Sequence, residues 1–591
     1  MATEQCKTTV IVVGSGLTGL TLALMLQDLG VDYLLLEAHG SCTPNVGASL
    51  AIQPQGLRIF HQLGILEDVE AIYQPVGQML SGDAETGKLH IIETTAILKE
   101  RHGYEIGFFN RYDLLCVLHK HIREKERLLV NQQITHVDGL EDKAIVHTSA
   151  GHFFEAQVVI GADGVRSTVR KEMWRNAEVA GAVPEEDKKE FICDWATCFG
   201  VSEYGASLPR GQVGSVSGDG FNAAWLLGKD GRCFTFWFFK LSRKARKVTY
   251  NTIPRFTEED YEREITRGKS LLAEVPRNNG LHIDFDQLYS QVHPAHSGIT
   301  ALPHFVLKKW HYGRIVVVGD SSHKFNPLPG HGGMNCLVSA ATLINCLQET
   351  LGDKLKTSQV WDVANLNEAF TKLAEKRFEK VKSAVEASEE AMNMMGWSNG
   401  YKKLLYKGLV PILPNFMQAN SATTVIRGGD ALQGWDLPTV PHTVKYDDEE
   451  KPIEKEKSIA LSPATLLLTA TAIGVGGIVV MRTLQKHPEL LANGRVSGCT
   501  LPRPSTYALS KGGAEHIFDL GFIVFEKQKL GPAHASISTS MAGLALMYLK
   551  QGRREELATP DRNVCITEKT VIISRSFASL RVLDENYWLS L

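Results

Sequence analysis

The sequence has almost no net charge and no closely spaced pair of cysteines. Its 63 lysine and arginine residues nearly balance 66 aspartate and glutamate residues, which leaves a formal net charge of -3. A chain without a broad basic field has no means of gathering phosphate backbones, so we expect no nucleic-acid partner. The ten cysteines include no CxxC pair, and the closest spacing, Cys193 to Cys198, matches no usual zinc arrangement. We therefore expect reduced, mostly buried thiols and no metal site.

The N-terminus lacks the features of a secretory signal. Glu4 and Lys7 lie within its first residues, and a strand-like run from Thr9 to Val13 follows them directly, which leaves no apolar core with a cleavage site. We expect the catalytic part to lie in the cytosol. The chain has 591 residues, of which 43% are hydrophobic, and this is enough for several domains with buried cores.

A strand, a glycine turn, a helix and a second strand follow one another near the N-terminus. Thr9 to Val13 is rich in β-branched residues, Leu17 to Leu29 has helical spacing, and Tyr33 to Leu36 is a second apolar run. This order is typical of a βαβ unit, in which crossover helices bury the parallel strands on both faces.

Three glycines between the first strand and the helix form a GxGxxG motif. Gly14 permits the tight turn, Gly16 lets a pyrophosphate approach the backbone, and Gly19 lets the helix pack closely on the strand. Glycine turns also occur for purely steric reasons, but Glu37 ends the second strand, where a carboxylate can accept hydrogen bonds from a ribose. We therefore predict a dinucleotide site, which suits FAD or NAD better than NADP because the acid repels a 2′-phosphate.

Two later strand-like runs also end in a glycine and an aspartate. Asp163 follows the run from Ala156 to Ile160, and Asp320 follows the run from Arg314 to Val318. Asp320 can bond a ribityl hydroxyl, and Gly333 opens a helical stretch whose N–H groups and positive dipole end can face a flavin pyrimidine ring. Each segment alone can be an ordinary turn. Three such motifs in this order indicate that widely separated strands join one sheet.

These motifs, GSGLTG with Glu37, GADGVRS and GDSSHKFNP, resemble the three fingerprints of the aromatic-hydroxylase-like flavoprotein monooxygenases, over about residues 8–385. The phrases GASLAIQPQGLRI, FFNRYDLL and GKDGRCFTFWFFKL look more closely like the fungal FAD-dependent monooxygenases of terpenoid and meroterpenoid biosynthesis. The resemblance implies FAD as the cofactor, with NAD(P)H and oxygen as co-substrates. It also implies epoxidation or hydroxylation of an apolar small molecule, such as a prenylated aromatic or a terpenoid intermediate.

The resemblance also implies which residues bind the cofactor, and it assigns no catalytic residue. The cofactor-binding residues are Gly14, Gly16, Gly19, Glu37, Ala51, Arg111, Asp163, Asp320 and Gly333. In this assignment Arg111 lies on the flavin side, although an ion pair with Asp113 or Glu105 is an alternative. Asp163 is better suited to holding its own loop than to acid–base catalysis.

The sequence departs from the family pattern near the flavin and the substrate. His331 lies in the loop expected over the flavin, and Phe221 and Trp225 lie where a substrate-side tyrosine is expected. A histidine beside a cofactor is more often a structural hydrogen-bond partner than a base, and this applies to both His323 and His331. The candidate pocket residues, which are alternatively core residues, are Phe221, Trp225, Phe236 and Trp237.

We predict an α/β fold, in which a Rossmann-like FAD-binding domain carries an inserted mixed-sheet substrate domain and a helical C-terminal extension follows. The predicted ranges are 1–189 and 305–395 for the FAD-binding domain, 190–304 for the substrate domain, and 396–457 for a helical region and charged linker. Within the insert, Cys233 to Phe239 is strand-like and Gly211 to Gly220 is a glycine-rich turn region. Leu366 to Met395 has the pattern of a long amphipathic helix. Lys445 to Lys457 is charged enough to be a solvated linker.

Residues 458–481 are a candidate transmembrane helix. Ser458 to Met481 contains no Asp, Glu, Lys or Arg and is long enough to cross a hydrocarbon layer of about 30 Å. Its threonines and glycines weaken the apolar signal, so a buried or interfacial helix is the alternative. We expect a membrane-associated protein with a cytosolic catalytic domain, or otherwise a cytoplasmic protein. Residues 482–591 have an irregular pattern to which no chemistry can be attached.

Two other functions fit the same motifs. The chain has no convincing second GxGxxG, so NAD(P)H has no fold of its own and is expected to bind transiently near the flavin. An FAD-dependent dehydrogenase or oxidase would instead remove hydride from its substrate. A non-catalytic, membrane-associated protein with a flavin fold would turn over no substrate.

Overall fold

The chain divides into two units, Met1–Ser458 and Ile459–Leu591. The computed structural model describes residues 6–450, apart from residues 46, 48, 183–184, 243–246, 278–282 and 358. In the second unit it describes five short strands, which are β25 Arg495–Val496, β26 Cys499–Thr500, β27 Val564–Ile566, β28 Thr570–Arg575 and β29 Ser579–Asp584. The first two strands pair antiparallel, and the other three form an antiparallel sheet.

A six-stranded sheet forms the centre of the FAD-binding domain, in the order β22-β23-β13-β2-β3-β9. Its strands are β2 Val10–Val13, β3 Tyr33–Leu36, β9 Leu128–Leu129, β13 Val158–Gly161, β22 His311–Tyr312 and β23 Ile315–Val317. All neighbours pair parallel except β22 and β23. Since β2, β13 and β23 come from distant parts of the chain and lie side by side, the prediction that they join one sheet is confirmed.

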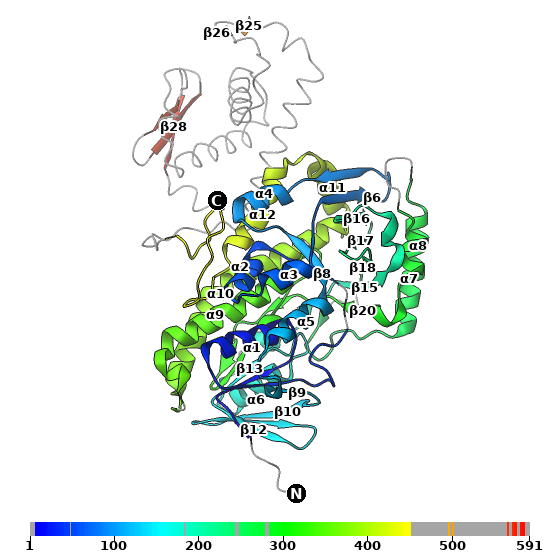
Figure 1. Ribbon diagram of the computed structural model, residues 1–591. Coiled ribbons are helices and arrows are strands. Elements are labelled where there is room, and N and C mark those ends of the chain that lie inside the picture. The colour runs from blue at the N-terminus through cyan, green and yellow to red at the C-terminus, as the bar shows by residue number, and fades with distance from the viewer. Residues whose placement is uncertain are drawn as a thin grey trace. The chain divides into compact units, whose positions relative to one another are not determined.

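Helices cover this sheet, and its central strands are buried as apolar runs between them. Helix α1, Leu17–Leu29, matches the predicted helix, and it packs against α9, Gly332–Leu351, which in turn packs against α10, Val363–Met395 (Figure 1). The remaining helices of this domain are α2 Pro54–Gln62, α3 Leu66–Ile72, α4 Thr95–His102, α5 Arg111–His121 and α6 Thr168–Val179. Smaller sheets are formed by β1 Cys6–Lys7, β10 Ile134–Gly139, β11 Ala144–Thr148 and β12 Phe153–Ala156, and by β4 Ser49–Ile52, β5 Gln74–Pro75 and β8 Gly107–Asn110.

A seven-stranded sheet forms the substrate domain, in the order β20-β15-β18-β17-β16-β6-β7. Its strands are β6 Gln78–Asp83, β7 Leu89–Ile92, β15 Trp195–Ser202, β16 Gln212–Gly218, β17 Phe221–Leu227, β18 Cys233–Lys240 and β20 Gly298–Ala301. Helices α7, Glu258–Ala273, and α8, Phe285–Ser290, flank it (Figure 1).

Two features of this sheet differ from the sequence-based expectation. Strands β6 and β7 come from before the inserted range, and β6 pairs parallel with β16. The region from Gly211 to Gly220 is not a run of turns, because Gln212–Gly218 forms a strand and only the flanking Gly211 and Gly220 have positive φ. The small residues of β16 lie under large aromatic neighbours, as where Gly214 lies under the Trp225 ring.

The C-terminal part of the first unit folds back onto the FAD-binding domain. Helices α11, Gly400–Leu409, and α12, Asn415–Arg427, follow α10. Residues 428–450, which we call the strap, contact α2 through Arg58 and Gln62. The strap includes the start of the predicted solvated linker, but Tyr446 is only 1% exposed, and Asp448 and Glu449 form ion pairs with Arg58 of α2. Lys445, Asp447, Asp448 and Glu450 are exposed, as a solvated stretch requires, but the contacts of Asp448 and Glu449 with a buried cation hold this part of the chain on α2.

The candidate transmembrane segment, residues 458–481, lies outside the described residues. Among the helices that are described, none combines the length and apolar character needed to cross a membrane. Six of the cysteines are buried in the described part of the chain, as expected, and all of those described there are free thiols.

Candidate functional site

The three strand-end motifs meet at the carboxyl edge of the six-stranded sheet. Backbone hydrogen bonds connect them: Gly14 N donates to Leu36 O over 2.8 Å, Ala162 N donates to Val13 O over 2.9 Å, and Val318 N donates to Gly161 O over 3.0 Å. The parallel pairing of β2, β13 and β23 places their last residues side by side. This edge of an open α/β sheet is where such folds bind their ligands.

The three glycines of the first motif have three different steric surroundings. Gly14 has a φ of 99°, and a Cβ atom built there would lie 2.7 Å from Ala162 O. A Cβ atom at Gly19 would lie 1.8 Å from Gly14 O, so this glycine lets α1 pack on the turn. A Cβ atom at Gly16 would meet only Arg111 Nη2, at 4.0 Å. Gly16 therefore borders open space, and no side chain caps the N-terminus of α1 above it.

Glu37 is buried and accepts four hydrogen bonds from two residues. Ser15 donates its backbone N–H and its hydroxyl to Oε2, over 2.8 and 2.7 Å, and His39 donates its backbone N–H and Nδ1–H to Oε1, over 2.9 and 2.6 Å. Burial raises the pKa of Glu37, but these hydrogen bonds outweigh it and hold the pKa below its ordinary value of 4.5. The carboxylate is thus ionised, and the His39 side chain, 74% exposed, occupies its solvent side.

Arg111 begins α5 and faces the same space. Its Nη2 lies 4.0 Å from the position of a Cβ atom on Gly16. Burial lowers its pKa, and the charges that oppose this shift are those of Asp320 and Glu37. Glu105, one of the two acids considered as an ion-pair partner of Arg111, pairs with Lys99 over 3.2 Å. Arg111 thus lies between the first and third strand-end motifs.

Asp320 lies at the end of β23 and contacts two groups that the sequence analysis did not single out. Lys324 forms a salt bridge with its carboxylate, and Cys336 Sγ lies 3.7 Å from Oδ1. Burial alone would lower the pKa of Lys324, but the neighbouring carboxylate raises it above its ordinary value, so the ammonium group stays charged. No helical spacing could have predicted this pair, because Asp320 lies in the short turn Gly319–Ser321 and Lys324 in the strand β24, His323–Lys324.

The Asp163 carboxylate is fully engaged by its own loop and by the third motif. It accepts hydrogen bonds from Thr168 N over 2.7 Å, Val169 N over 3.0 Å and the hydroxyls of Ser167 and Ser321. The backbone donors belong to the first turn of α6, where a negative charge is favoured by the helix dipole. This geometry matches the loop-holding role considered for Asp163.

The loop before α9 packs closely against β4. Gly330 has a φ of 73°, and a Cβ atom there would lie 2.8 Å from Ala51 Cβ. A Cβ atom on Gly333 would lie 2.9 Å from the side chain of Leu50. No side chain caps α9 and no acid lies in its first turn. The N–H groups and positive dipole end of this 20-residue helix are therefore available to a ligand with partial negative charge.

Both histidines near this loop are neutral. His323 is fully buried, bonds Ser339 Oγ through Nε2 over 3.0 Å, and has a pKa lowered to about 3, mainly by burial. His331 Nδ1 lies 3.1 Å from Gln53 Nε2, and burial lowers the pKa of His331 to about 4. Neither ring is suited to taking up a proton near neutral pH, which agrees with the structural alternative for these histidines.

The two faces of the substrate sheet separate the four aromatic pocket candidates. Three of them, Phe221, Trp225 and Trp237, belong to the core cluster under α7 and α8. Phe236 lies on the opposite face with Phe238, to which its ring is stacked at 5.7 Å. This face contacts Leu328 of the loop before α9. Only Phe236 is therefore placed to line a pocket beside the strand-end motifs, because alternate residues of a strand point to opposite faces.

The charged and polar groups at this edge of the sheet fit an adenine dinucleotide with a flavin. Two helix N-termini without side-chain caps and the cations Arg111 and Lys324 offer positive potential to phosphates and to a flavin pyrimidine ring. The carboxylates of Glu37 and Asp320 offer acceptors to ribose and ribityl hydroxyls. Within the described residues, no cluster of histidine, cysteine and acidic side chains could hold a metal ion.

Comparison with known proteins identifies the family. Residues 7–186 match the model of the FAD binding domain. The FAD-dependent monooxygenase ausM of Penicillium brasilianum is 31% identical over 414 residues, which cover 69% of this chain and 83% of the relative. The FAD-dependent monooxygenase cle3 of Aspergillus versicolor is 31% identical over 483 residues, which cover 80% of this chain and 91% of the relative.

Solved structures with low identity share the fold. HpxO of Klebsiella pneumoniae, complexed with FAD and uric acid, has a TM-score of 0.58 and 19% identity, over 72% of this chain and 97% of that chain. The p-nitrophenol 4-monooxygenase PnpA of Pseudomonas putida DLL-E4 has a TM-score of 0.55 and 18% identity, over 71% of this chain and 98% of that chain. The resemblance inferred from the motifs, the fold class and FAD as cofactor are confirmed. The chain belongs to the fungal FAD-dependent monooxygenases of secondary metabolite pathways, within the aromatic-hydroxylase-like flavoprotein family.

Proposed function

We propose that this monooxygenase uses NAD(P)H and oxygen to epoxidise or hydroxylate an apolar secondary metabolite, such as a prenylated aromatic or a terpenoid intermediate. The observation that carries the proposal is the apolar sheet face beside the strand-end motifs. Phe199, Leu226 and Phe236 are only partly buried there, although they lie among fully buried apolar neighbours. A pocket lined by such side chains favours an apolar ligand, because burial of its surface supplies the binding energy.

We assign the FAD contacts to the residues at the sheet edge. Gly14, Gly16 and Gly19 shape the turn on which the pyrophosphate lies, between the N-terminus of α1 and Arg111. Glu37 receives the adenosine ribose. Since all four of its acceptor positions are filled, a ribose hydroxyl has to displace a present donor. The exposed His39 side chain is the group that can leave most easily.

We assign the flavin contacts to the third strand-end motif, to β4 and to the start of α9. Asp320 bonds the ribityl chain, and Lys324 holds the carboxylate of Asp320 through their salt bridge. Ala51 and Gly333 approach the flavin through their backbones, and the N-terminus of α9 stabilises negative charge on its pyrimidine ring. Asp163 acts by holding the loop between the motifs. The bound FAD supplies the redox chemistry that activates oxygen, and the chain's residues position it and exclude water.

NAD(P)H is proposed as a transient co-substrate rather than a resident one. The sequence contains one GxGxxG that follows a strand and precedes a helix, and Glu37 makes that site unsuited to a 2′-phosphate. The reductant therefore has to reach the flavin from the solvent and leave again before the substrate is oxidised.

The test is turnover with isotopically labelled oxygen. Purified full-length protein is incubated with NADPH or NADH, ¹⁸O₂ and a panel of prenylated phenols and terpenoids, and the products are analysed by mass spectrometry. We expect one ¹⁸O atom in the product and one NAD(P)H consumed for each product formed. A product that lacks ¹⁸O and forms without NAD(P)H consumption would indicate a dehydrogenase or oxidase. Protein that binds FAD but oxidises NAD(P)H at the same rate with and without every compound would contradict the substrate class.

We further propose that residues 458–481 tether the catalytic part to a membrane, with residues 1 to about 450 in the cytosol. The support is the uncharged composition from Ser458 to Met481, with basic residues on both sides. Apolar substrates partition into lipid, so a tether raises their concentration near the pocket. Full-length protein should sediment with membranes and resist carbonate extraction, whereas a chain ending near Lys457 should not.

A further inference from the structure

The side chain of His331 is held by a chain of two glutamine amides on α2. Gln55 Nε2 donates to Gln53 Oε1 over 3.1 Å. Both amide atoms of Gln53 face His331 Nδ1, with Nε2 at 3.1 Å and Oε1 at 3.2 Å. Since Gln53 Oε1 already accepts from Gln55, we assign the hydrogen bond with His331 Nδ1 to the slightly nearer amide nitrogen. Nδ1 then accepts, and the hydrogen of the neutral ring is on Nε2.

The backbone of His331 is held by a second chain of polar groups. Asn335 Nδ2 donates to His331 O over 3.1 Å, and Arg377 Nη2 donates to Asn335 Oδ1 over 2.7 Å. Arg377 is 1% exposed and also donates from Nη1 to Gly428 O over 3.3 Å. Both chains thus lead from His331 to the first residues of the strap.

Gly429 of the strap lies directly on the glutamine chain. A Cβ atom on Gly429 would lie 2.3 Å from Gln55 Cβ, so the strap backbone and the Gln55 side chain are in close contact. Gly429 does not have a positive φ. Glycine is therefore required here by the approach of Gln55 and not by backbone strain.

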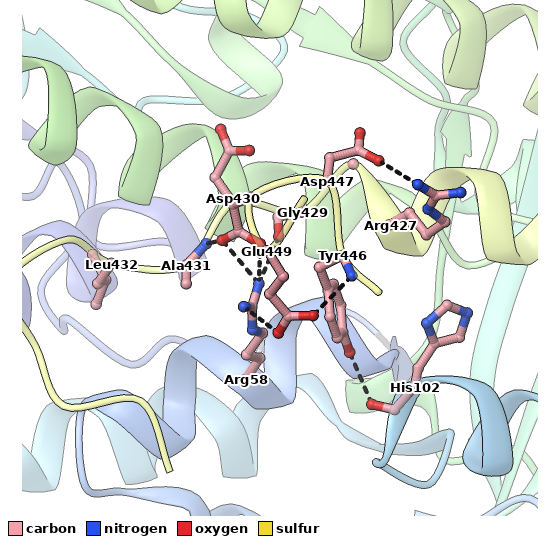
Figure 2. A network of polar contacts seen from close by, with 12 residues as sticks. Arg58, His102, Arg427, Gly429, Asp430, Ala431, Leu432, Tyr446, Asp447 and Glu449 are labelled. Carbon is pink, nitrogen blue, oxygen red and sulfur yellow. Dashed lines mark hydrogen bonds and ion pairs between the residues drawn. The ribbon is translucent and has the colours of Figure 1, made fainter. Parts of the chain in front are cut away.

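A buried arginine fastens the strap to α2 one turn after Gln55. Arg58 is 3% exposed, donates from Nη1 to Asp448 Oδ1 over 2.8 Å and from Nη2 to Glu449 Oε1 over 2.9 Å, and lies 4.2 Å from the centre of the Tyr446 ring. Figure 2 shows the arginine head enclosed by the two ends of the strap, at Gly429 and at Tyr446 to Glu449. A folded protein is strongly destabilised when a buried cation loses its carboxylate partners. The ion pairs of Arg58 therefore keep the strap in place.

We propose that the strap, residues 428–450, is a positioning element for the flavin site: through Gln55 and Gln53 it fixes His331 in the tautomer that presents Nε2–H as a hydrogen-bond donor towards the bound cofactor. The inference rests on the proposed flavin position at the loop before α9. Among the residues that the structure describes, no group bonds His331 Nε2, and Nε2 is not one of the fully buried unpaired atoms. It is thus available to a ligand beside Gly330 and Ala51.

A fixed neutral donor suits the reduction of a flavin. The reduced ring carries more negative charge, which a donor at the N-terminus of α9 stabilises together with the helix dipole. Burial keeps His331 from adding a full positive charge, because its pKa is lowered to about 4. The donor strength then stays constant through the physiological pH range.

The first test is the tautomer of His331 in the full-length protein, read from the ¹⁵N shifts of labelled histidine and assigned by comparison with His331→Gln. We expect the Nε2–H form at pH 7 in the wild type. In Gln53→Glu the carboxylate should draw the hydrogen to Nδ1 and raise the pKa of the ring. The Nδ1–H form in the wild type would overturn the proposal. This measurement does not require bound FAD.

The second test is the midpoint potential of bound flavin, measured with a reference dye during slow enzymatic reduction. Gln53→Leu and His331→Phe should make the potential more negative, and Gln53→Glu should give it a pH-dependent step between pH 5 and 8 that the wild type lacks. Wild-type potentials in both Gln53 variants, with FAD bound, would overturn the role proposed for Gln53 and His331.

The strap is tested by Gly429→Ala, which pushes on Gln55, and by Arg58→Met, which releases both carboxylates. Each should shift the potential in the same direction as Gln53→Leu. The controls are Gly408→Ala on α11, where a Cβ atom would meet nothing within 4 Å, and Arg263→Gln on α7, which breaks the exposed pair with Asp260. Both controls should keep the wild-type potential. Equal shifts of the flavin potential in the test variants and the control variants would contradict a specific effect of the strap through Gln55. If the wild type binds no FAD, the proposed function fails. The tautomer measurement still shows whether Gln53 fixes His331 in the Nε2–H form.

Discussion

Gly16→Ala should abolish tight FAD binding while leaving the fold intact. The φ of Gly16 is −68°, which suits any residue, and the added Cβ atom would meet only Arg111 Nη2, at 4.0 Å. We therefore expect the unfolding free energy of the FAD-free protein to change by less than about 0.5 kcal/mol. The methyl group occupies the space assigned to the pyrophosphate. Loss of one or two charge-assisted hydrogen bonds, at about 1.5–3 kcal/mol each, raises the Kd between about tenfold and about twenty-thousandfold.

Gly19→Ala is the matched control, because it makes the same chemical change three residues later. Its Cβ atom would lie 1.8 Å from Gly14 O, so α1 has to move by more than about 1 Å to relieve the overlap. We expect a loss of at least about 2 kcal/mol of unfolding free energy. The measurements are urea unfolding without FAD and titration of apoprotein with FAD, followed by quenching of flavin fluorescence. A wild-type Kd in Gly16→Ala, or equal destabilisation by both variants, would refute the reasoning.

Three further predictions concern the acids of the site. Glu37→Gln should raise the FAD Kd about tenfold or more, because the amide N–H₂ group that replaces one oxygen cannot accept from either Ser15 or the ribose. Glu126→Gln, at an exposed site, should not raise it. Because hydrogen bonds hold the pKa of Glu37 below 4.5, the carboxylate stabilises the fold above that pH and the stabilisation is lost as pH falls through the folded-state pKa. The difference in unfolding free energy between wild type and Glu37→Gln, measured by urea unfolding, should thus be constant from pH 6 to 8 and shrink in acid; a constant difference at all pH values would contradict this. Asp163→Asn should lower the unfolding free energy by about 1–3 kcal/mol with a small change in FAD Kd, and the reverse pattern would place Asp163 on the cofactor.

The elements that the sequence predicted well are those whose pattern reflects burial on both faces. The helix Leu17–Leu29 and the strand Tyr33–Leu36 have the predicted bounds, because glycines end the first and the second is a continuous apolar run. The meeting of the three strand ends was also predictable, since parallel strands in one sheet align their carboxyl ends. The pairing of β6 and β7 with the inserted strands was not predicted, because order along the chain does not reveal pairing between distant segments.

Side-chain partners within the site were less predictable than the site itself. Lys324 and Gln53 lie at the ends of short elements, where no periodic pattern marks them, and their roles depend on contacts with distant loops. The contact of the start of the charged linker with α2 was not predicted, because charge in a sequence does not show that Arg58, far upstream, is buried. Likewise, the inward or outward direction of Trp225 and Phe236 depends on register, which a one-residue shift reverses.

The most direct test of the account is a crystal structure of the full-length protein with bound FAD. We expect the pyrophosphate between the N-terminus of α1 and Arg111, the ribose at Glu37 in place of the His39 side chain, and the flavin beside Gly330 to Gly333. Density for FAD elsewhere, or a ribose that does not contact Glu37, would contradict the proposed site.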